Sequence, residues 1–135
     1  MKFEDIRFKA WVKKSKQMIK VHRLEFHRSG EISDVYTYNE DLDPMDDDYI
    51  HNYYPEELIL LPFTGFKDKN GEEIYEGDIV KKPYDLGNAM VKIKEGAIHI
   101  ENLNGTFTYL FSDETAKGLL IIGNVFMNPE LLKKG

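Results

Sequence analysis

Cysteine is absent from this chain of 135 residues, and its absence removes whole classes of chemistry. Without thiols there is no disulfide bond, no thiolate nucleophile, and no zinc or iron–sulfur site built on cysteine. A domain this small that folds without disulfides is typical of a reducing compartment. We therefore expect a cytoplasmic protein.

Long apolar runs are also lacking. The longest one, Leu119–Ile122, is far too short to cross a membrane. The opening residues carry the charges of Glu4, Asp5 and Arg7 and contain no apolar stretch, so we expect no signal peptide and no membrane partner.

Motifs that bind phosphate, metal or cofactor are missing as well. The spacing from Gly65 to Gly71 is not that of a P-loop, and there is no Rossmann fingerprint or serine nucleophile elbow. The acidic segment 40–48 lacks the EF-hand spacing that calcium needs. The histidines show no zinc-binding spacing; they are His22, His27, His51 and His99. We expect no metal, no cofactor and no enzymatic activity.

The triplet Glu76-Gly77-Asp78 brings two carboxylates close together in the sequence. Two carboxylates around a glycine could act as a general acid and base. An aspartate before a strand, however, usually accepts backbone N–H bonds in a turn, and glycine supplies a positive φ there. The pattern favours a structural corner over a catalytic site.

The charge that is present is distributed unevenly. The net charge is −6, but residues 1–30 carry +6 and residues 31–62 carry −10. Neighbouring segments of opposite sign are commonest where they neutralise each other within one fold. The alternative is a partner surface, or head-to-tail self-association in which the basic segment of one molecule meets the acidic loop of another.

Alternating apolar residues predict strands in the first half of the chain. We expect strands over Ile6–Val12, Met18–Phe26 and Ile32–Tyr38, then the acidic loop 40–48 and a short helix opened by Pro55. We treat residues 1–62 as a small N-terminal β-rich, α+β part.

The second half predicts a small barrel. Asn70-Gly71 and Asn104-Gly105 are tight-turn pairs in which glycine takes a positive φ. Five strands at short spacing follow residue 78, the last over Gly118–Phe126, and a short helix follows Asn128. The strand pattern predicts a shared core; its expected members are Val91, Ile93, Phe107, Tyr109 and Ile121.

Three segments resemble the YopX family of phage and prophage proteins. They are the block Phe63–Val80, FTGFKDKNGEEIYEGDIV, the opening Ile6–Trp11, and the closing Ile121–Leu132. The resemblance implies a mainly β, α+β protein with an N-terminal part over 1–62 and an SH3-like five-stranded barrel over 63–135 that ends in a short helix. The family brings no established activity and no mapped functional residues, so no site is carried over.

Two functions remain open at this point. The first is a non-enzymatic phage accessory protein that binds an unknown protein partner, of the host or of its own kind. The alternative is a nucleic-acid-binding barrel that uses the basic N-terminal segment, where the candidate binding residues are Trp11, Lys13, Lys14 and Lys16. A pI near 5.2 weighs against the alternative because an acidic protein repels phosphate.

Overall fold

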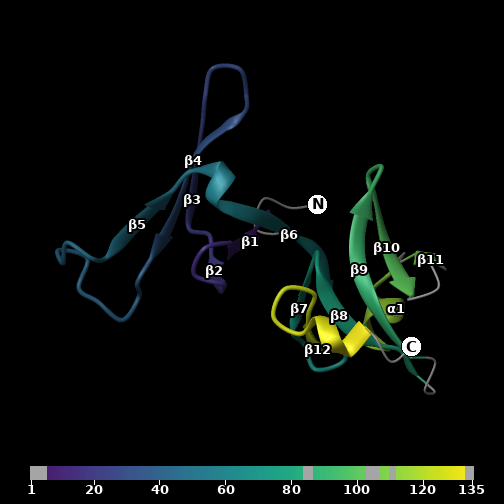
Figure 1. Ribbon diagram of the computed structural model, residues 1–135. Helices are drawn as coiled ribbons and strands as arrows, with labels where there is room; N and C mark the ends of the chain where they lie inside the picture. The colour runs from purple at the N-terminus through teal and green to yellow at the C-terminus, as the bar shows by residue number, and fades with distance from the viewer. Residues whose placement is uncertain (1–5, 84–86, 103–106, 110–111, 133–135) are drawn as a thin grey trace. The chain divides into compact units, whose positions relative to one another are not determined.

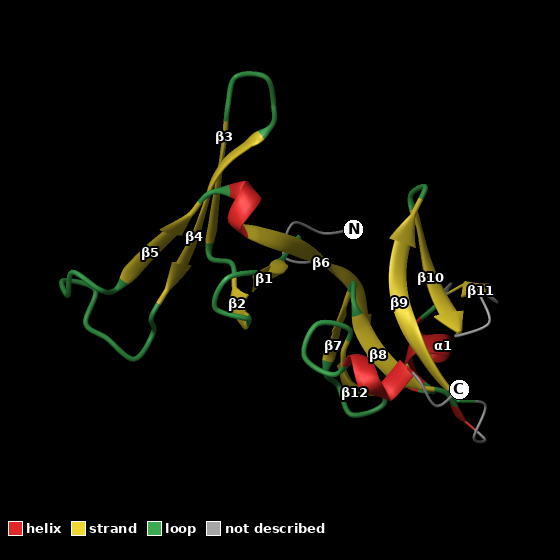
Figure 2. Cartoon of the chain, in the orientation of Figure 1, coloured by secondary structure: helices red, strands yellow, loops and turns green. Residues whose placement is uncertain are grey.

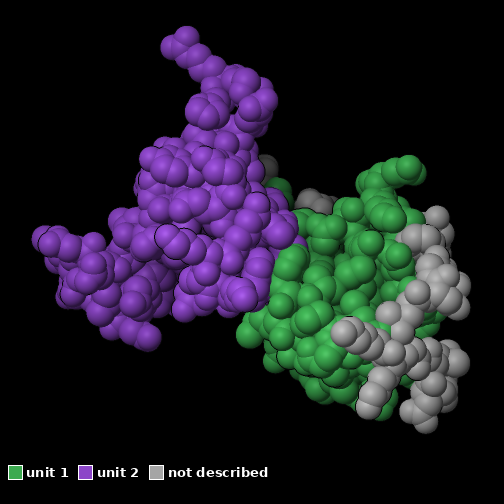
Figure 3. Space-filling view, viewed as in Figure 1, with its two compact units in different colours: residues 1–6, 62–135 green, residues 7–61 purple. Residues whose placement is uncertain are grey.

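The computed structural model describes residues 6–83, 87–102, 107–109 and 112–132. The protein is mainly β, with antiparallel sheets and short helical turns (Figures 1 and 2). The chain divides into two compact units, which Figure 3 colours separately. Unit 1 comprises residues 1–6 and 62–135, and unit 2 comprises residues 7–61.

The elements run in the following order. Unit 2 contains β1 (Phe8–Val12), β2 (Gln17–Lys20), β3 (Arg23–Phe26), β4 (Ile32–Tyr38), β5 (Ile50–Tyr53) and the 3₁₀ turn η2 (Pro55–Glu57). Strand β6 (Leu58–Lys67) begins in unit 2 and ends in unit 1. Unit 1 continues with β7 (Glu73–Tyr75), β8 (Asp78–Lys81), β9 (Asn88–Lys94), β10 (Ala97–Asn102), β11 (Phe107–Tyr109), α1 (Asp113–Lys117), β12 (Leu120–Asn124) and the 3₁₀ turn η4 (Pro129–Leu132).

The core of unit 2 lies under a three-stranded sheet with the order β3-β4-β5. Val35, in the central strand, is fully buried and clusters with Ala10 and Leu58. Because side chains alternate across a strand, the residues on either side of Val35 project from the opposite face of this sheet. The sheet therefore has one core face and one outer face.

The expected strand over Met18–Phe26 is wrong, because the chain forms two strands there. β2 pairs with β1 and β3 pairs with β4, in separate sheets. At the junction, the backbone N–H of Val21 bonds to the carbonyl of Phe8, whereas the next N–H, that of His22, bonds to Tyr36. The residues that pack against the core change parity at this junction, from Ile19 and Val21 to Leu24, which a single straight strand does not allow.

Unit 1 is built around a five-stranded antiparallel sheet with the order β11-β10-β9-β8-β12. The last strand returns beside the first, and Val80, Val91 and Ile100 are buried in its core. Val91 belongs to this cluster and Ile121 packs against it, as predicted, whereas Ile93 is only partly buried. The side chains of Phe107 and Tyr109 lie outside the described residues.

Local turn chemistry agrees with the sequence at the described turns. Gly71 has a φ of +80°, as predicted, while Gly105 lies outside the described residues. The final strand covers Leu120–Asn124 rather than Gly118–Phe126, because Gly118 caps helix α1 and the side chain of Asn124 accepts from the N–H of Phe126 in a turn. Helix α1, capped at its start by Ser112, was not anticipated. The expected C-terminal helix is the 3₁₀ turn η4, which begins at Pro129. No helix among the described residues is long and apolar enough to cross a bilayer.

Candidate functional site

An open hollow of about 820 Å³ lies within unit 2. One wall is the end of β1 and the turn that follows it, and the other is formed by β5 and η2. The lining residues are Val12, Lys13, Lys14, Ser15, Gln17, His51, Tyr53, Glu56 and Glu57. The hollow thus joins residues about forty positions apart in the sequence.

Backbone pairing fixes the geometry of this hollow. The Lys13 N–H donates to the carbonyl of Glu57 at 3.1 Å, and the Lys13 ammonium donates to the carbonyl of Glu56 at 3.2 Å. The carboxylate of Glu57 accepts from the N–H of Tyr54 at 2.7 Å, which caps η2. The turn of the β1–β2 hairpin is therefore fastened to η2, and the two walls are held at a defined separation.

The wall formed by β5 is aromatic. The rings of His51 and Tyr53 lie with their centroids 4.4 Å apart at an angle of 35°. Burial, and to a lesser extent the negative charge of Glu57, raise the pKa of the Tyr53 hydroxyl. The site therefore combines a partly apolar, aromatic wall with charges of both signs.

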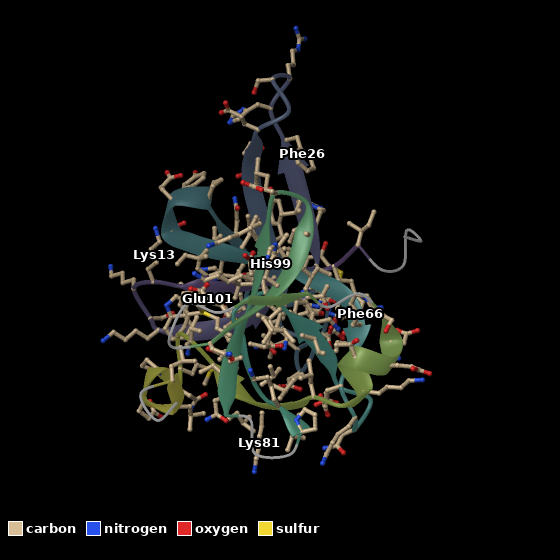
Figure 4. The ribbon with its side chains drawn as sticks, turned by 90° about the vertical axis from the view of Figure 1, so that its right-hand side faces the viewer. Lys13, Phe26, Phe66, Lys81, His99 and Glu101 are labelled. Atoms are coloured by element: carbon tan, nitrogen blue, oxygen red, sulfur yellow. The ribbon has the colours of Figure 1, made fainter. Side chains whose placement is uncertain are left out.

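The four candidate residues from the sequence are not all placed in this hollow. Lys13 and Lys14 line it, and Figure 4 shows Lys13 at the periphery of the protein. Lys16 is exposed in the same turn with a φ of +55° but does not line the hollow. Trp11 is partly buried in β1, opposite Met18 of β2. Sequence reasoning missed His51, Tyr53 and the two glutamates, because nothing local signals that β5 lies opposite the turn.

Strand β5 also forms one edge of the three-stranded sheet. An edge strand presents backbone N–H and C=O groups that can pair with an added strand. Because β5 also lines the hollow, an extended peptide lying along this edge would place side chains in the hollow.

The carboxylates of the Glu76-Gly77-Asp78 triplet bind backbone. Asp78 accepts from the N–H of Tyr75 at 2.8 Å, and Glu76 accepts from the N–H of Ile93 at 3.1 Å. Gly77 has a φ of +90°. This is the geometry of a corner that positions β8 and β9, as the structural interpretation of the triplet expects.

The acidic loop 40–48 is a series of turns stabilised by its own side chains. Asp43 accepts from the N–H of Met45 at 2.8 Å, and Asp46 accepts from the N–H of Asp48 at 2.9 Å. Within the residues the structure describes, no three acidic or histidine side chains converge in a metal-binding arrangement. Short polar side chains are common at such positions because they can imitate a backbone turn.

Comparisons with known proteins place the chain in a family. The YopX protein family model matches residues 7–133, so the chain belongs to the YopX family. A crystal structure of a protein from Enterococcus faecalis is similar over 94% of this chain and 97% of that one, with a TM-score of 0.63 and 27% identity. No curated protein matches the chain in sequence.

A second similar structure is the crystal structure of the YopX protein of Bacillus subtilis. It covers 95% of this chain and 98% of that one, with a TM-score of 0.61 and 18% identity. From its length and its family-like segments alone, the chain could have been taken for the YopX protein itself. At this identity, however, the two are different sequences that share a fold.

Proposed function

We propose that this chain is a non-enzymatic phage or prophage accessory protein that works in the cytoplasm by binding another protein through the hollow of unit 2. The observation that carries the proposal is the juxtaposition of the hollow with the edge of β5. A sheet edge beside a hollow can bind a peptide segment of a partner in two ways: the edge pairs with its backbone, and the hollow contacts its side chains.

An SH3-like barrel in unit 1 would also fit a protein that works by binding. The order β11-β10-β9-β8-β12, with the helix α1 before the last strand, is compatible with an SH3-like barrel in unit 1. Small barrels of this kind commonly serve as binding modules. The C-terminal part over 63–135 would then be a stable scaffold, and the N-terminal part over 1–62 would supply the recognition surface.

The proposal is tested by affinity capture with the tagged full-length chain from lysates of host cells and of phage-infected cells. We expect a partner that binds the wild-type chain but not Lys14→Glu/Gln17→Glu, because both side chains are exposed and line the hollow. Lys117→Glu, an exposed reversal on α1, is the matched control and should retain the partner.

The captured partner is then purified and its affinity for each variant is measured by calorimetry. Equal affinity for the wild-type chain and the hollow variant would overturn the proposal. A partner that proves to be nucleic acid, lost on nuclease treatment, would support the alternative function instead.

A further inference from the structure

The outer face of the three-stranded sheet in unit 2 carries aromatic side chains. Val35 points to the core, so Tyr36 and Tyr38 of β4 project on the other side, paired with Asn52 and Ile50 of β5. Tyr36 and Tyr38 are partly exposed, and Ile50 is 48% exposed. We call this surface the aromatic face; it consists of Arg23, Tyr36, Tyr38, Tyr49, Ile50 and Asn52.

The rings of the aromatic face are held in a fixed arrangement. Tyr38 stacks on Tyr49 at a centroid distance of 5.4 Å and on His22 at 4.8 Å. The imidazole of His22 accepts from the N–H of Tyr38 at 3.0 Å and bonds to the carboxylate of Glu40 at 2.7 Å. Because the backbone N–H is a donor only, Nδ1 is the accepting nitrogen and Nε2 carries the proton toward Glu40.

One ring of the aromatic face already holds a cation from the chain itself. The guanidinium carbon of Arg23 lies 4.0 Å from the centre of the Tyr36 ring. The Arg23 guanidinium also donates to Glu25 at 2.9 Å. Within the face, the guanidinium of Arg23 is thus bound by an aromatic ring and a carboxylate together, the two kinds of group that recognise arginine.

The surroundings of the aromatic face are negative. Glu25, Asp34 and Glu40 flank it, and the loop from β4 to β5 adds Asp41, Asp43, Asp46, Asp47 and Asp48. Lys20, 3.8 Å from Glu40, offsets one of these charges and Arg23 another. Within the same loop the side chain of Met45 is 90% exposed, which adds an apolar contact beside the charges.

We propose that the aromatic face binds an extended segment of a partner protein rich in arginine or lysine. The charge complementarity carries this choice of occupant, since the carboxylates attract cations and repel the phosphates of nucleic acid. A second copy of this chain could offer its basic hairpin turn. That contact would join two different surfaces, and it would build either a closed ring or an open chain of molecules.

This surface is separate from the hollow described above. On β5, His51 and Tyr53 line the hollow, whereas Ile50 and Asn52 belong to the alternate set of side chains that face the other way. The proposal thus goes beyond the proposed function, and the two can fail independently.

The test uses the full-length chain and a fluorescein-labelled peptide of alternating arginine and serine, with anisotropy as the readout. We expect binding that weakens as salt rises, and no binding of the same peptide with citrulline in place of arginine, because citrulline is a neutral analogue. Tyr38 is stacked between His22 and Tyr49, so the ring tested is Tyr49, at the end of the stack. Tyr49→Leu should weaken binding about two- to thirtyfold, the range that a cation–π contact supplies. Asp47→Asn/Asp48→Asn should also weaken peptide binding, and the effect should be larger at low salt than at high salt.

Three variants serve as controls. Tyr54→Leu removes an exposed tyrosine of unit 2 that lies outside the aromatic face, and Glu114→Gln removes an exposed carboxylate on α1. Lys14→Glu/Gln17→Glu alters only the hollow. All three should bind the arginine peptide like the wild-type chain, and circular dichroism should show that every variant is folded.

Two results would overturn the proposal. One is an arginine peptide that does not bind, or that binds Tyr49→Leu and Asp47→Asn/Asp48→Asn as tightly as it binds the wild-type chain. The other is a salt-sensitive oligomer of the wild-type chain, seen by sedimentation and abolished by the same variants, which would assign the face to a second copy of the chain.

Discussion

The carboxylate of Asp68 accepts a hydrogen bond from the backbone N–H of Ile121 at 3.0 Å, across 53 positions of sequence. Its other oxygen accepts from the N–H groups of Asn70 and Glu72, both at 2.9 Å. Asp68 is only 3% exposed. One buried carboxylate therefore holds a tight turn and attaches that turn to the last strand of unit 1.

Replacing this aspartate by asparagine should destabilise the protein. In Asp68→Asn the amide oxygen can keep the two turn bonds, but the NH₂ group then meets the N–H of Ile121, donor against donor. The expected loss in the free energy of unfolding is about 1–3 kcal/mol, measured by urea titration. Asp43→Asn, at an exposed turn that asparagine also supports, should change it by less than about 0.5 kcal/mol. Equal effects of the two substitutions would contradict the assigned role.

The same carboxylate should make stability depend on pH. Burial raises the pKa of Asp68, but the N–H donors of Ile121, Glu72 and Asn70 outweigh burial, and the pKa lies below its ordinary value of 3.8. A lowered folded-state pKa gives stability that is fully present above 3.8 and is lost as pH falls through the folded-state pKa. The stability difference between the wild-type chain and Asp68→Asn should therefore shrink as pH falls from 7 toward about 2. A difference that stays constant or grows on acidification would argue against this linkage.

Gly71 should resist substitution because of its backbone conformation alone. An added Cβ would meet nothing within 4 Å, but the φ of +80° is unfavourable for residues with a side chain. Gly71→Ala should therefore cost about 1–2 kcal/mol in unfolding free energy. Gly118→Ala is the matched control, because Gly118 has a φ of −83° and its added Cβ would make ordinary contacts. Thermal unfolding that ranks the two variants in the opposite order would exclude this explanation.

We expect the basic hairpin turn not to bind nucleic acid. The Lys13 ammonium donates a hydrogen bond to the carbonyl of Glu56, and Glu56 and Glu57 line the same hollow. The negative charges of these glutamates oppose phosphate binding there. Gel shifts with mixed DNA and RNA should show no binding at roughly 1–100 µM protein, the range of non-specific phosphate binding. A shift that disappears in Lys13→Glu/Lys14→Glu/Lys16→Glu and weakens with salt would restore the nucleic-acid alternative.

The acidic loop should not bind calcium in the range of sensor proteins. Asp43 and Asp46 each use an oxygen to bond the backbone two residues ahead, so the carboxylates stabilise turns rather than converge. Calorimetric titration should show no site with a dissociation constant of about 0.1–10 µM. Heat of binding in that range, lost in Asp46→Asn/Asp48→Asn, would show that the loop can rearrange around the ion.

Much of the local structure of this protein is determined by its sequence. The Asn70-Gly71 turn, strand β4 over Ile32–Tyr38 and the Pro129 helical turn follow from short-range preferences: glycine tolerates positive φ, alternation exposes one face, and proline suits the first helical position. The family can also be recognised from the sequence, because the block Phe63–Val80 is long and contiguous. The family model matches residues 7–133.

Only the tertiary structure decided which segments meet. The core-facing residues change parity between Val21 and Leu24, but only long-range pairing shows that β2 joins β1 while β3 joins β4. The hollow depends on the register of β5 against β4, and the aromatic face depends on the parity that burial of Val35 imposes. Pairing partners and register arise from long-range packing and backbone hydrogen bonds, which a linear pattern of residues does not encode position by position.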